Sequence, residues 1–185
     1  DLPGDVREAL GAARAEVWPE VAALDPALAA RSPIEIMRAL VARLADGDDL
    51  ATALRLLAAP AVFTAAAIRV QAGSAPVPPD PTLGHAADIL RMARGAPATT
   101  AEAATLDAYL VPIADHGFNA STFAARVVAS TRAGLGSAVL AGISALKGPL
   151  HGGAPGPVIE MLDAIGTPAN ARPWLEAAVD RGDRL

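Results

Sequence analysis

Two short polar segments carry the residues that could do chemistry, and the first is Ala114–Thr122, with the sequence ADHGFNAST. Its His116, Asn119 and Ser121 offer an imidazole, an amide and a hydroxyl, which together could bind a small polar ligand such as a dicarboxylate. The alternative is structural. A helix would end at Gly117 with His116 in its last turn, and Ser121 would be the N-cap of the next helix. Taken alone, the segment favours the structural role.

The second polar segment surrounds His151 and reads LKGPLHGGAPG. Gly152 and Gly153 remove side chains beside the histidine, so a ligand or another backbone can come close. Pro155 and Pro157 fit the first turn of a following helix, whose N-terminus disfavours a charged imidazolium. A neutral imidazole can donate a hydrogen bond to a carbonyl that becomes an enolate. Without other information, a histidine in a structural turn remains the simpler interpretation.

The rest of the chain offers little other chemistry. His85 begins a predicted helix and is interpreted as structural, and the chain has no cysteine. The metalloprotease, serine hydrolase, phosphate-loop and dinucleotide motifs do not occur. No histidine and carboxylate set has metal-ligand spacing, so we expect no metal site and no permanently bound cofactor. The net charge of −5 has no basic stripe, which argues against binding to nucleic acid.

Hydropathy bears on membranes and on assembly. The mean hydropathy is +0.35, and the longest apolar runs are Leu56–Ile68 and Gly134–Leu146. Both are shorter than the ~18–20 residues that a membrane span needs, so we expect no membrane association. The chain opens without a secretory leader, which predicts a cytoplasmic protein. Helices buried on all sides and a large subunit interface both explain the hydropathy, and this pattern does not choose between them.

The elements that must position these residues are predicted to be helices. Alanine is abundant and alternating β-branched runs are almost absent, so the expected fold class is all-α. Ser32 is expected to cap a helix, and a long apolar helix is expected to bend or break at Pro60. Residues 74–84 contain four prolines and form the one expected linker. Gly95 and Gly117 are expected to end helices in the left-handed conformation.

The stretch from Ala114 to Gly153, ADHGFNASTFAARVVASTRAGLGSAVLAGISALKGPLHGG, resembles the citrate synthase family. The upstream segment PVPPDPTLGHAADIL resembles the family's loop into a helix, whereas the resemblance is weak before Arg69. It implies a citrate synthase-like large helical domain over residues 1–151. The first helices of a small helical domain would follow over residues 152–185, with the hinge at Gly152 and Gly153.

The resemblance also implies an activity and roles for the polar residues. The family condenses acetyl-CoA with oxaloacetate to give citrate and CoA, through enolisation and thioester hydrolysis. It is an acyltransferase that converts the acyl group into an alkyl group on transfer. His151 matches the residue that hydrogen-bonds the thioester carbonyl, and His116 matches a histidine that holds oxaloacetate. Asn119 and Ser121 line the same pocket, and acetyl-CoA is a co-substrate rather than a resident cofactor.

Some of the family's machinery has no match in these 185 residues. The aspartate base, the arginines that bind carboxylates and the histidine of a GFGHRVY-like segment are absent. We therefore expect that the chain lacks the family's C-terminal part and that the fragment alone is inactive. Ala154, Pro155 and Gly156 stand where the family usually has Ala-Asn-Glu, and Ile113 stands where it often has histidine. Both departures bear on the choice of substrate.

Two alternatives and one assembly prediction accompany the resemblance. The chain could belong to a 2-methylcitrate synthase that uses propionyl-CoA, or it could be a non-catalytic helical assembly module. Citrate synthases pair through a layer of helices, which Ser121–Thr131 and Gly136–Leu146 resemble. Small residues there let backbones approach closely, so we expect a homodimer that buries more than ~2,000 Å² in total.

Overall fold

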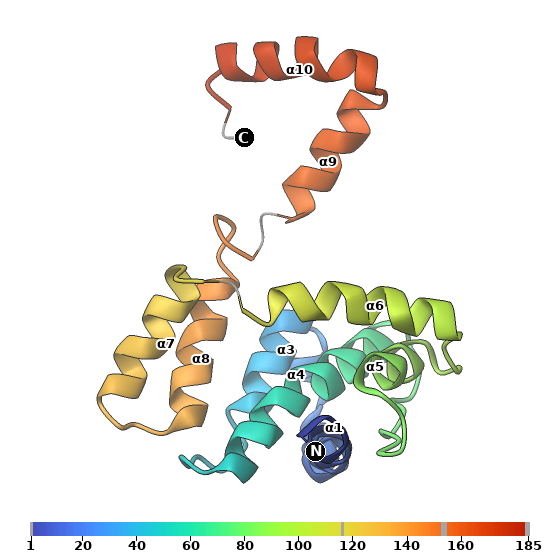
Figure 1. Cartoon of the computed structure of the whole chain (residues 1–185), viewed down its shortest axis with the longest axis vertical. Helices are drawn as coiled ribbons and strands as arrows, with labels where there is room; N and C mark the ends of the chain where they lie inside the picture. The colour runs from blue at the N-terminus through green and yellow to red at the C-terminus, as the bar shows by residue number, and fades with distance from the viewer. Residues whose placement is uncertain (1, 116, 153–154, 184–185) are drawn as a thin grey trace. The chain divides into compact units, whose positions relative to one another are not determined.

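The computed structural model of the chain describes residues 2–115, 117–152 and 155–183. Over these ranges it contains helices and no strand, which confirms the predicted all-α fold (Figure 1). The chain divides into two compact units, residues 1–145 and residues 146–185, and each is described by itself. The predicted domain boundary at residues 151 and 152 stays a prediction.

In the first unit, three α-helices and a 3-10 helix lead into the long helix α4. Its elements are α1 (Leu2–Val17), the 3-10 helix η1 (Trp18–Ala23), α2 (Pro26–Ala29), α3 (Pro33–Val41), α4 (Leu50–Gln71), α5 (His85–Arg94), α6 (Thr100–Ile113), α7 (Ala120–Ser130) and α8 (Leu135–Leu146), whose last residue falls in the second unit. The second unit continues with α9 (Pro155–Ile165) and α10 (Pro168–Asp180), which contact each other.

Helix α4 is the centre of the first unit, because it contacts α1, α3 and α5. Its Val62 and Phe63 are fully buried, together with Ile36 and Leu40 of α3 and Met92 of α5. At 22 residues α4 is long and apolar enough to cross a membrane by length and composition, which the shorter run Leu56–Ile68 did not suggest. Half of its most apolar stretch is buried within the unit, as expected for a core helix.

The structure also shows whether Pro60 interrupts α4. A break, one of the two predicted outcomes, does not occur, since α4 continues from Leu50 to Gln71. The proline ring removes one backbone hydrogen bond, which by itself weakens a helix. Burial of Ala58, Ala59 and Val62 on α4 offsets that loss, so packing against the neighbouring helices determines the outcome.

Several helix ends follow the local sequence, and one does not. Ser32 caps α3 as predicted, and its hydroxyl donates to a Glu35 carboxylate oxygen at 2.8 Å. Gly95 ends α5 with a φ of 80°, also as predicted. Gly117 has the predicted left-handed conformation, with a φ of 67°, but the prediction that α6 reaches it is wrong, because α6 ends at Ile113. The Gly117 amide donates to Asp115 Oδ1 at 3.0 Å, and this local turn replaces further helical bonding.

The proline-rich segment between α4 and α5 contains no helix, as predicted, and a buried arginine holds it in place. Arg14 of α1 donates from Nη2 to the carbonyl oxygens of Asp80, at 3.1 Å, and Leu83, at 2.8 Å. A Cβ on Gly11 would lie 2.2 Å from the Pro81 carbonyl oxygen, so only glycine allows this close approach. The segment is therefore fixed against α1 by backbone contacts.

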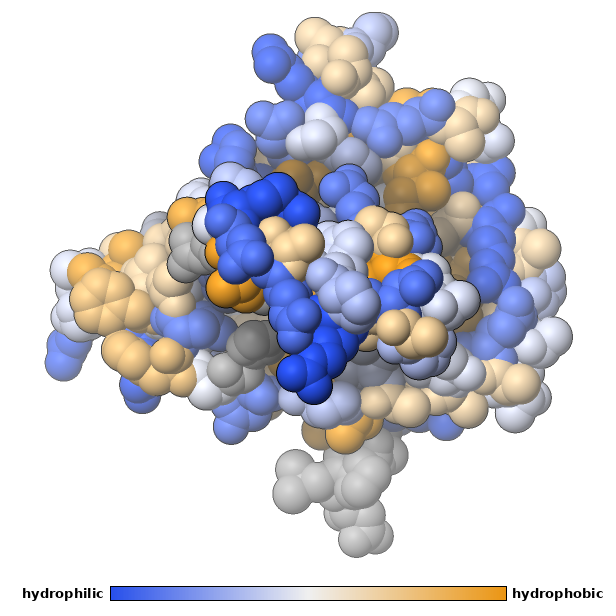
Figure 2. Space-filling view, turned by 90° about the horizontal axis from the view of Figure 1, so that it is seen from above, coloured by the Kyte–Doolittle hydropathy of each residue, from blue (hydrophilic) through white to orange (hydrophobic). Residues whose placement is uncertain are grey.

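Some apolar side chains remain exposed on the first unit, and Figure 2 shows hydrophobic residues interspersed with hydrophilic ones on one face of the molecule. Around α6, α7 and the turn between them the exposed apolar side chains are Tyr109, Val111, Ile113, Phe118, Phe123 and Val127. Every residue of α6 and α7 is at least partly exposed in this unit. These two helices therefore form an exposed apolar surface that another protein chain could cover.

Candidate functional site

The first candidate site residues lie at the start of α7. The N-cap is Asn119 and not Ser121, so the predicted N-cap is wrong. Asn119 Oδ1 accepts from the Thr122 amide at 2.9 Å and from the Ser121 hydroxyl at 2.8 Å. Ser121 therefore belongs to the first turn, where its hydroxyl is tied to the cap. His116 lies outside the described residues, and α6 ends before reaching it.

Two aromatic side chains flank this corner. The rings of Phe118 and Phe123 pack edge to face, with their centroids 5.8 Å apart. The Arg126 guanidinium lies over the Phe118 ring at 5.9 Å from its centroid. Since Phe118 precedes the cap and Phe123 belongs to α7, this contact joins the turn to the helix and restrains Asn119 between them.

The second candidate site is the turn that carries His151. The His151 amide donates to the Gly148 carbonyl at 3.0 Å, and the Gly152 amide donates to the Leu146 carbonyl at 2.8 Å. These bonds fold the chain back onto the end of α8. A Cβ on Gly152 would lie 2.4 Å from the Leu146 oxygen, so the turn itself requires glycine there. His151 is half-buried in this turn.

The environment of His151 agrees in part with the sequence analysis. Helix α9 begins at Pro155 and includes Pro157 in its first turn, as predicted, so the histidine precedes a helix N-terminus in sequence. Gly153 lies outside the described residues. The local turn explains Gly152 without a ligand, and the predicted hinge at Gly152 and Gly153 stays a prediction.

The two candidate sites fall in different units. Asn119 and Ser121 belong to the first unit, and His151 belongs to the second. The geometry of each site is therefore given within its own unit. Across the ranges 2–115, 117–152 and 155–183, no group of three or more histidine, cysteine, aspartate or glutamate residues could hold a metal ion.

One residue that the sequence analysis missed holds the helix leading to His151. Asp46, from the loop after α3, accepts hydrogen bonds from the Gly136 amide at 2.7 Å, the Ser137 amide at 3.1 Å and the Ser137 hydroxyl at 2.7 Å. The Ser137 hydroxyl bond is the main cause of a lowered Asp46 pKa. Asp46 thus caps α8 from far away in the sequence. The sequence GLGSAV at the start of α8 has no capping residue directly before it, and this could have indicated that a distant residue caps the helix.

His85 belongs to a buried polar network with Arg14 and Asp88, and the interpretation of His85 as structural stays a prediction. Arg14 Nε donates to Asp88 Oδ2 at 2.8 Å, and its Nη1 lies 3.3 Å from His85 Nδ1. Both Arg14 and Asp88 are fully buried. Burial, and then the adjacent Arg14 guanidinium, lower the pKa of His85 below its usual value. Arg91 also donates to Asp88, at 2.7 Å from Nη2.

Comparison with known proteins shows which family the chain matches. Over residues 4–185 the chain matches the family model described as Citrate synthase, C-terminal domain. A 2-methylcitrate synthase of Mycobacterium tuberculosis is 40% identical over 161 residues, which covers 83% of this chain and 41% of that protein. A citrate synthase of Mycolicibacterium smegmatis is 36% identical over 163 residues, which covers 83% of this chain and 44% of that protein.

A solved structure agrees with these relatives. The ternary complex of carboxymethyl coenzyme A and oxaloacetate with citrate synthase from Thermoplasma acidophilum superposes with a TM-score of 0.79 at 25% identity, covering 97% of this chain and 50% of that one. The chain spans less than half the length of the curated relatives named above. Since the family model covers nearly the whole chain and the helical fold agrees, this chain belongs to the citrate synthase family.

Proposed function

We propose that the chain is part of an enzyme that condenses acetyl-CoA with oxaloacetate to give citrate and CoA. The observation that carries this proposal is the pair of polar segments, ADHGFNAST and GPLHGG, in a chain that matches the family over residues 4–185. The related structure that contains oxaloacetate and a coenzyme A analogue supports the same pair of substrates.

In this proposal His151 acts on the acetyl thioester. A base removes a proton from the methyl group while the His151 imidazole donates a hydrogen bond to the thioester oxygen, where negative charge develops. Such a donor is most effective when its position is fixed before the reaction. The backbone bonds to Gly148 and Leu146 restrain the turn that carries His151, which supports this role.

The enol carbon then attacks the ketone carbon of oxaloacetate. A carbon–carbon bond forms and the ketone oxygen takes up a proton, which gives a citryl thioester. Water hydrolyses that thioester and releases citrate and the CoA thiol. By the resemblance, the base and the histidine that assists the attack come from segments with no match in these 185 residues. We therefore propose that these residues alone do not catalyse the condensation.

Oxaloacetate is proposed to lie at the start of α7, against His116, Asn119 and Ser121. The N-terminus of a helix favours carboxylate groups, because its free amides and the helix dipole attract negative charge. The Asn119 cap orders this end of α7, since its Oδ1 accepts from both Thr122 and Ser121. Residues of the corner would then hold the carboxylate groups of oxaloacetate.

A second candidate function is 2-methylcitrate synthesis from propionyl-CoA and oxaloacetate. The specific observation in its favour is the relative named 2-methylcitrate synthase, which is 40% identical, compared with 36% for the citrate synthase of Mycolicibacterium smegmatis. The two substrates differ by one methylene, which a pocket can discriminate by about 10- to 200-fold. The ratio of kcat/KM for acetyl-CoA and propionyl-CoA decides between them.

We further propose that the protein works in the cytoplasm as a homodimer. Phe123 and Val127 are exposed on one face of α7, four residues apart. A Cβ on Gly142 of α8 would lie 3.5 Å from the Ala125 Cβ, so small residues hold α7 and α8 close together. A second copy covering α6 and α7 would bury the exposed apolar residues there. A monomer by light scattering at micromolar concentration would contradict the dimer.

One assay tests the proposed reaction. The full-length gene product is mixed with oxaloacetate and acetyl-CoA, and the free CoA thiol is followed with time. We expect thiol release that depends on oxaloacetate. Release that is equally fast without oxaloacetate would indicate a simple thioesterase. No thiol release with acetyl-CoA, nor with propionyl-CoA in its place, would favour a non-catalytic assembly module.

A further inference from the structure

The first unit contains an apolar groove that lies apart from the two polar segments proposed for the condensation reaction. Its volume is about 370 Å³, and α4, α5 and α6 form its walls. The lining includes Ala61, Thr64, Ile68, His85, Ile89 and Leu110. Apolar concave sites with a few polar groups are typical of small-molecule binding. His85 is the titratable group among the lining residues.

The neighbouring arginine determines which nitrogen of His85 carries the proton. Arg14 is buried and can only donate hydrogen bonds, and its Nη1 lies 3.3 Å from His85 Nδ1. The other donors of Arg14 serve Asp88, at 2.8 Å, and the carbonyls of Asp80 and Leu83. Nδ1 must therefore present its lone pair to Arg14, so the neutral ring carries its proton on Nε2.

This arrangement leaves Nε2 as a donor without a protein acceptor among the residues that the structure describes. The contact with Arg14 uses Nδ1, on the other side of the ring, and no hydrogen bond of Nε2 occurs over these residues. Since His85 lines the groove, a bound molecule can supply the missing acceptor. Arg14 fixes the ring, so the donor is oriented before a ligand arrives.

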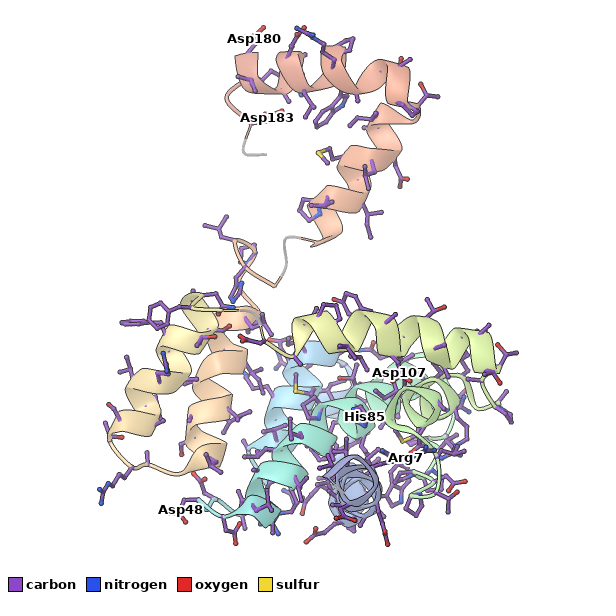
Figure 3. All side chains as sticks on the ribbon, in the orientation of Figure 1. Arg7, Asp48, His85, Asp107, Asp180 and Asp183 are labelled. Carbon is purple, nitrogen blue, oxygen red and sulfur yellow. The ribbon has the colours of Figure 1, made fainter. Side chains whose placement is uncertain are left out.

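The charges that face His85 decide which acceptor fits. Burial disfavours the protonated ring, and Arg14 on α1 acts in the same direction. Asp88 on α5 and Asp107 on α6 act in the opposite direction, and Figure 3 labels His85 and Asp107. The net effect lowers the pKa of His85 below its usual value, so the neutral ring predominates at pH 7. An anionic ligand would meet an uncharged donor and the nearby Asp107 carboxylate, whereas a neutral carbonyl would not be repelled.

We propose that this groove binds a small neutral molecule whose apolar body packs between α4 and α6 and whose carbonyl oxygen accepts a hydrogen bond from His85 Nε2. The site lies wholly within the first unit and needs neither oxaloacetate nor an acyl-CoA. The 185-residue chain can therefore be tested directly, and the result does not depend on whether the condensation proposal holds.

Three monosubstituted benzenes separate the contribution of the carbonyl hydrogen bond from that of apolar packing and of charge. Acetophenone has a carbonyl, ethylbenzene lacks it, and benzoate replaces it with a carboxylate. Backbone amide spectra of the ¹⁵N-labelled chain are recorded during titration with each probe. We expect saturable shifts with acetophenone confined to α4, α5 and α6, and about five-fold weaker binding of ethylbenzene, the factor for one neutral hydrogen bond. Benzoate should bind no better than ethylbenzene.

Variants and the ring nitrogens complete the test. Ala61→Phe fills the groove from α4 and should abolish the shifts, whereas Ala51→Phe, at an exposed position of the same helix, should leave them unchanged. Nitrogen spectra of His85 should show the proton on Nε2. Absence of saturable shifts, binding of ethylbenzene as tight as acetophenone, or a proton on Nδ1 would overturn the proposal. Groove shifts that follow protein concentration alone would also overturn it, because a second copy would then occupy the groove.

Discussion

Gly152 lies directly against Leu146: its amide donates to the Leu146 carbonyl at 2.8 Å, and a Cβ on Gly152 would lie 2.4 Å from that oxygen. The neighbouring His151 depends on this contact, because the same turn fixes its backbone. A side chain at position 152 must therefore displace the turn and, with it, the imidazole that we propose to contact the thioester.

Gly152→Ala in the full-length enzyme should lower kcat by about 10- to 100-fold, since a displacement of about 1 Å can cost ~10²-fold in rate. Oxaloacetate affinity should stay nearly constant, because the proposed oxaloacetate residues lie on the other polar segment. Steady-state kinetics and calorimetry measure the two quantities. Gly156→Ala is the control, since a Cβ there meets nothing within 4 Å, and its kcat should stay within about two-fold.

Loss of the long-range cap on α8 should destabilise the chain. Asp46→Ala removes the acceptor for the Gly136 and Ser137 amides, and we expect a loss of about 0.5–2 kcal/mol in the free energy of unfolding. Asp48→Ala in the same loop removes an exposed carboxylate and should change stability by less than about 0.5 kcal/mol (Figure 3). Urea denaturation of both variants checks the difference. Equal stabilities would mean that the cap contributes nothing.

Removal of the buried arginine should be more costly. Arg14→Met leaves the buried Asp88 with one partner fewer and frees the Asp80 and Leu83 carbonyls, so we expect a loss of about 3–5 kcal/mol. Arg172→Ala breaks an exposed pair with Glu176 on α10 and should cost less than about 1 kcal/mol. Denaturation followed by circular dichroism compares them. A loss below 1 kcal/mol for Arg14→Met would contradict the role assigned to this network.

The His85 environment predicts a pH dependence of stability. Burial and Arg14 lower the folded-state pKa of His85 below the 6.5 of an unperturbed histidine, so below pH 6.5 the unfolded chain binds more protons at this residue. Its stabilising contribution is therefore complete above about pH 6.5 and is lost as the pH falls through 6.5 toward the folded-state pKa.

The comparison with His85→Gln isolates this effect, because the glutamine oxygen can still accept from Arg14 but does not titrate. Between pH 7.5 and 5.5 the wild type should lose more unfolding free energy than His85→Gln. Other titrating groups contribute equally to both proteins and cancel. Parallel pH profiles for the two proteins would show that His85 is not held neutral in the folded state.

Features set by neighbouring residues could be predicted from the sequence. Ser32 with Glu35 three residues later forms the expected cap, and Gly95 ends α5 in the left-handed conformation. The prediction of Ser121 as the N-cap is wrong, because Asn119, two positions earlier, is an equally good capping residue. The extended backbone of Asn119, with φ −110° and ψ −179°, settles the choice in the fold. Local patterns thus locate a helix start to within a turn.

Features set by distant residues could not be predicted. The cost of Pro60 within α4 is local, but the packing that offsets it comes from α1, α3 and α5. Asp46 and Ser137 are 91 positions apart, and Arg14 and Asp88 are 74 apart, so neither pair leaves a pattern in a single sequence. The polar segment around His151 was visible from its residue types, whereas the requirement of its turn for Gly152 needed the position of the Leu146 carbonyl.

The most direct test of the proposed condensation measures kcat and oxaloacetate affinity for His151→Ala in the full-length enzyme, with His116→Ala as its counterpart. The account predicts that His151→Ala lowers kcat by about 10²–10³-fold, the usual effect of losing one donor to a developing oxyanion, and leaves the oxaloacetate Kd within about three-fold. His116→Ala should weaken oxaloacetate binding first. If His151→Ala loses oxaloacetate affinity but keeps its kcat at saturation, or if it behaves as wild type, the central claim is contradicted.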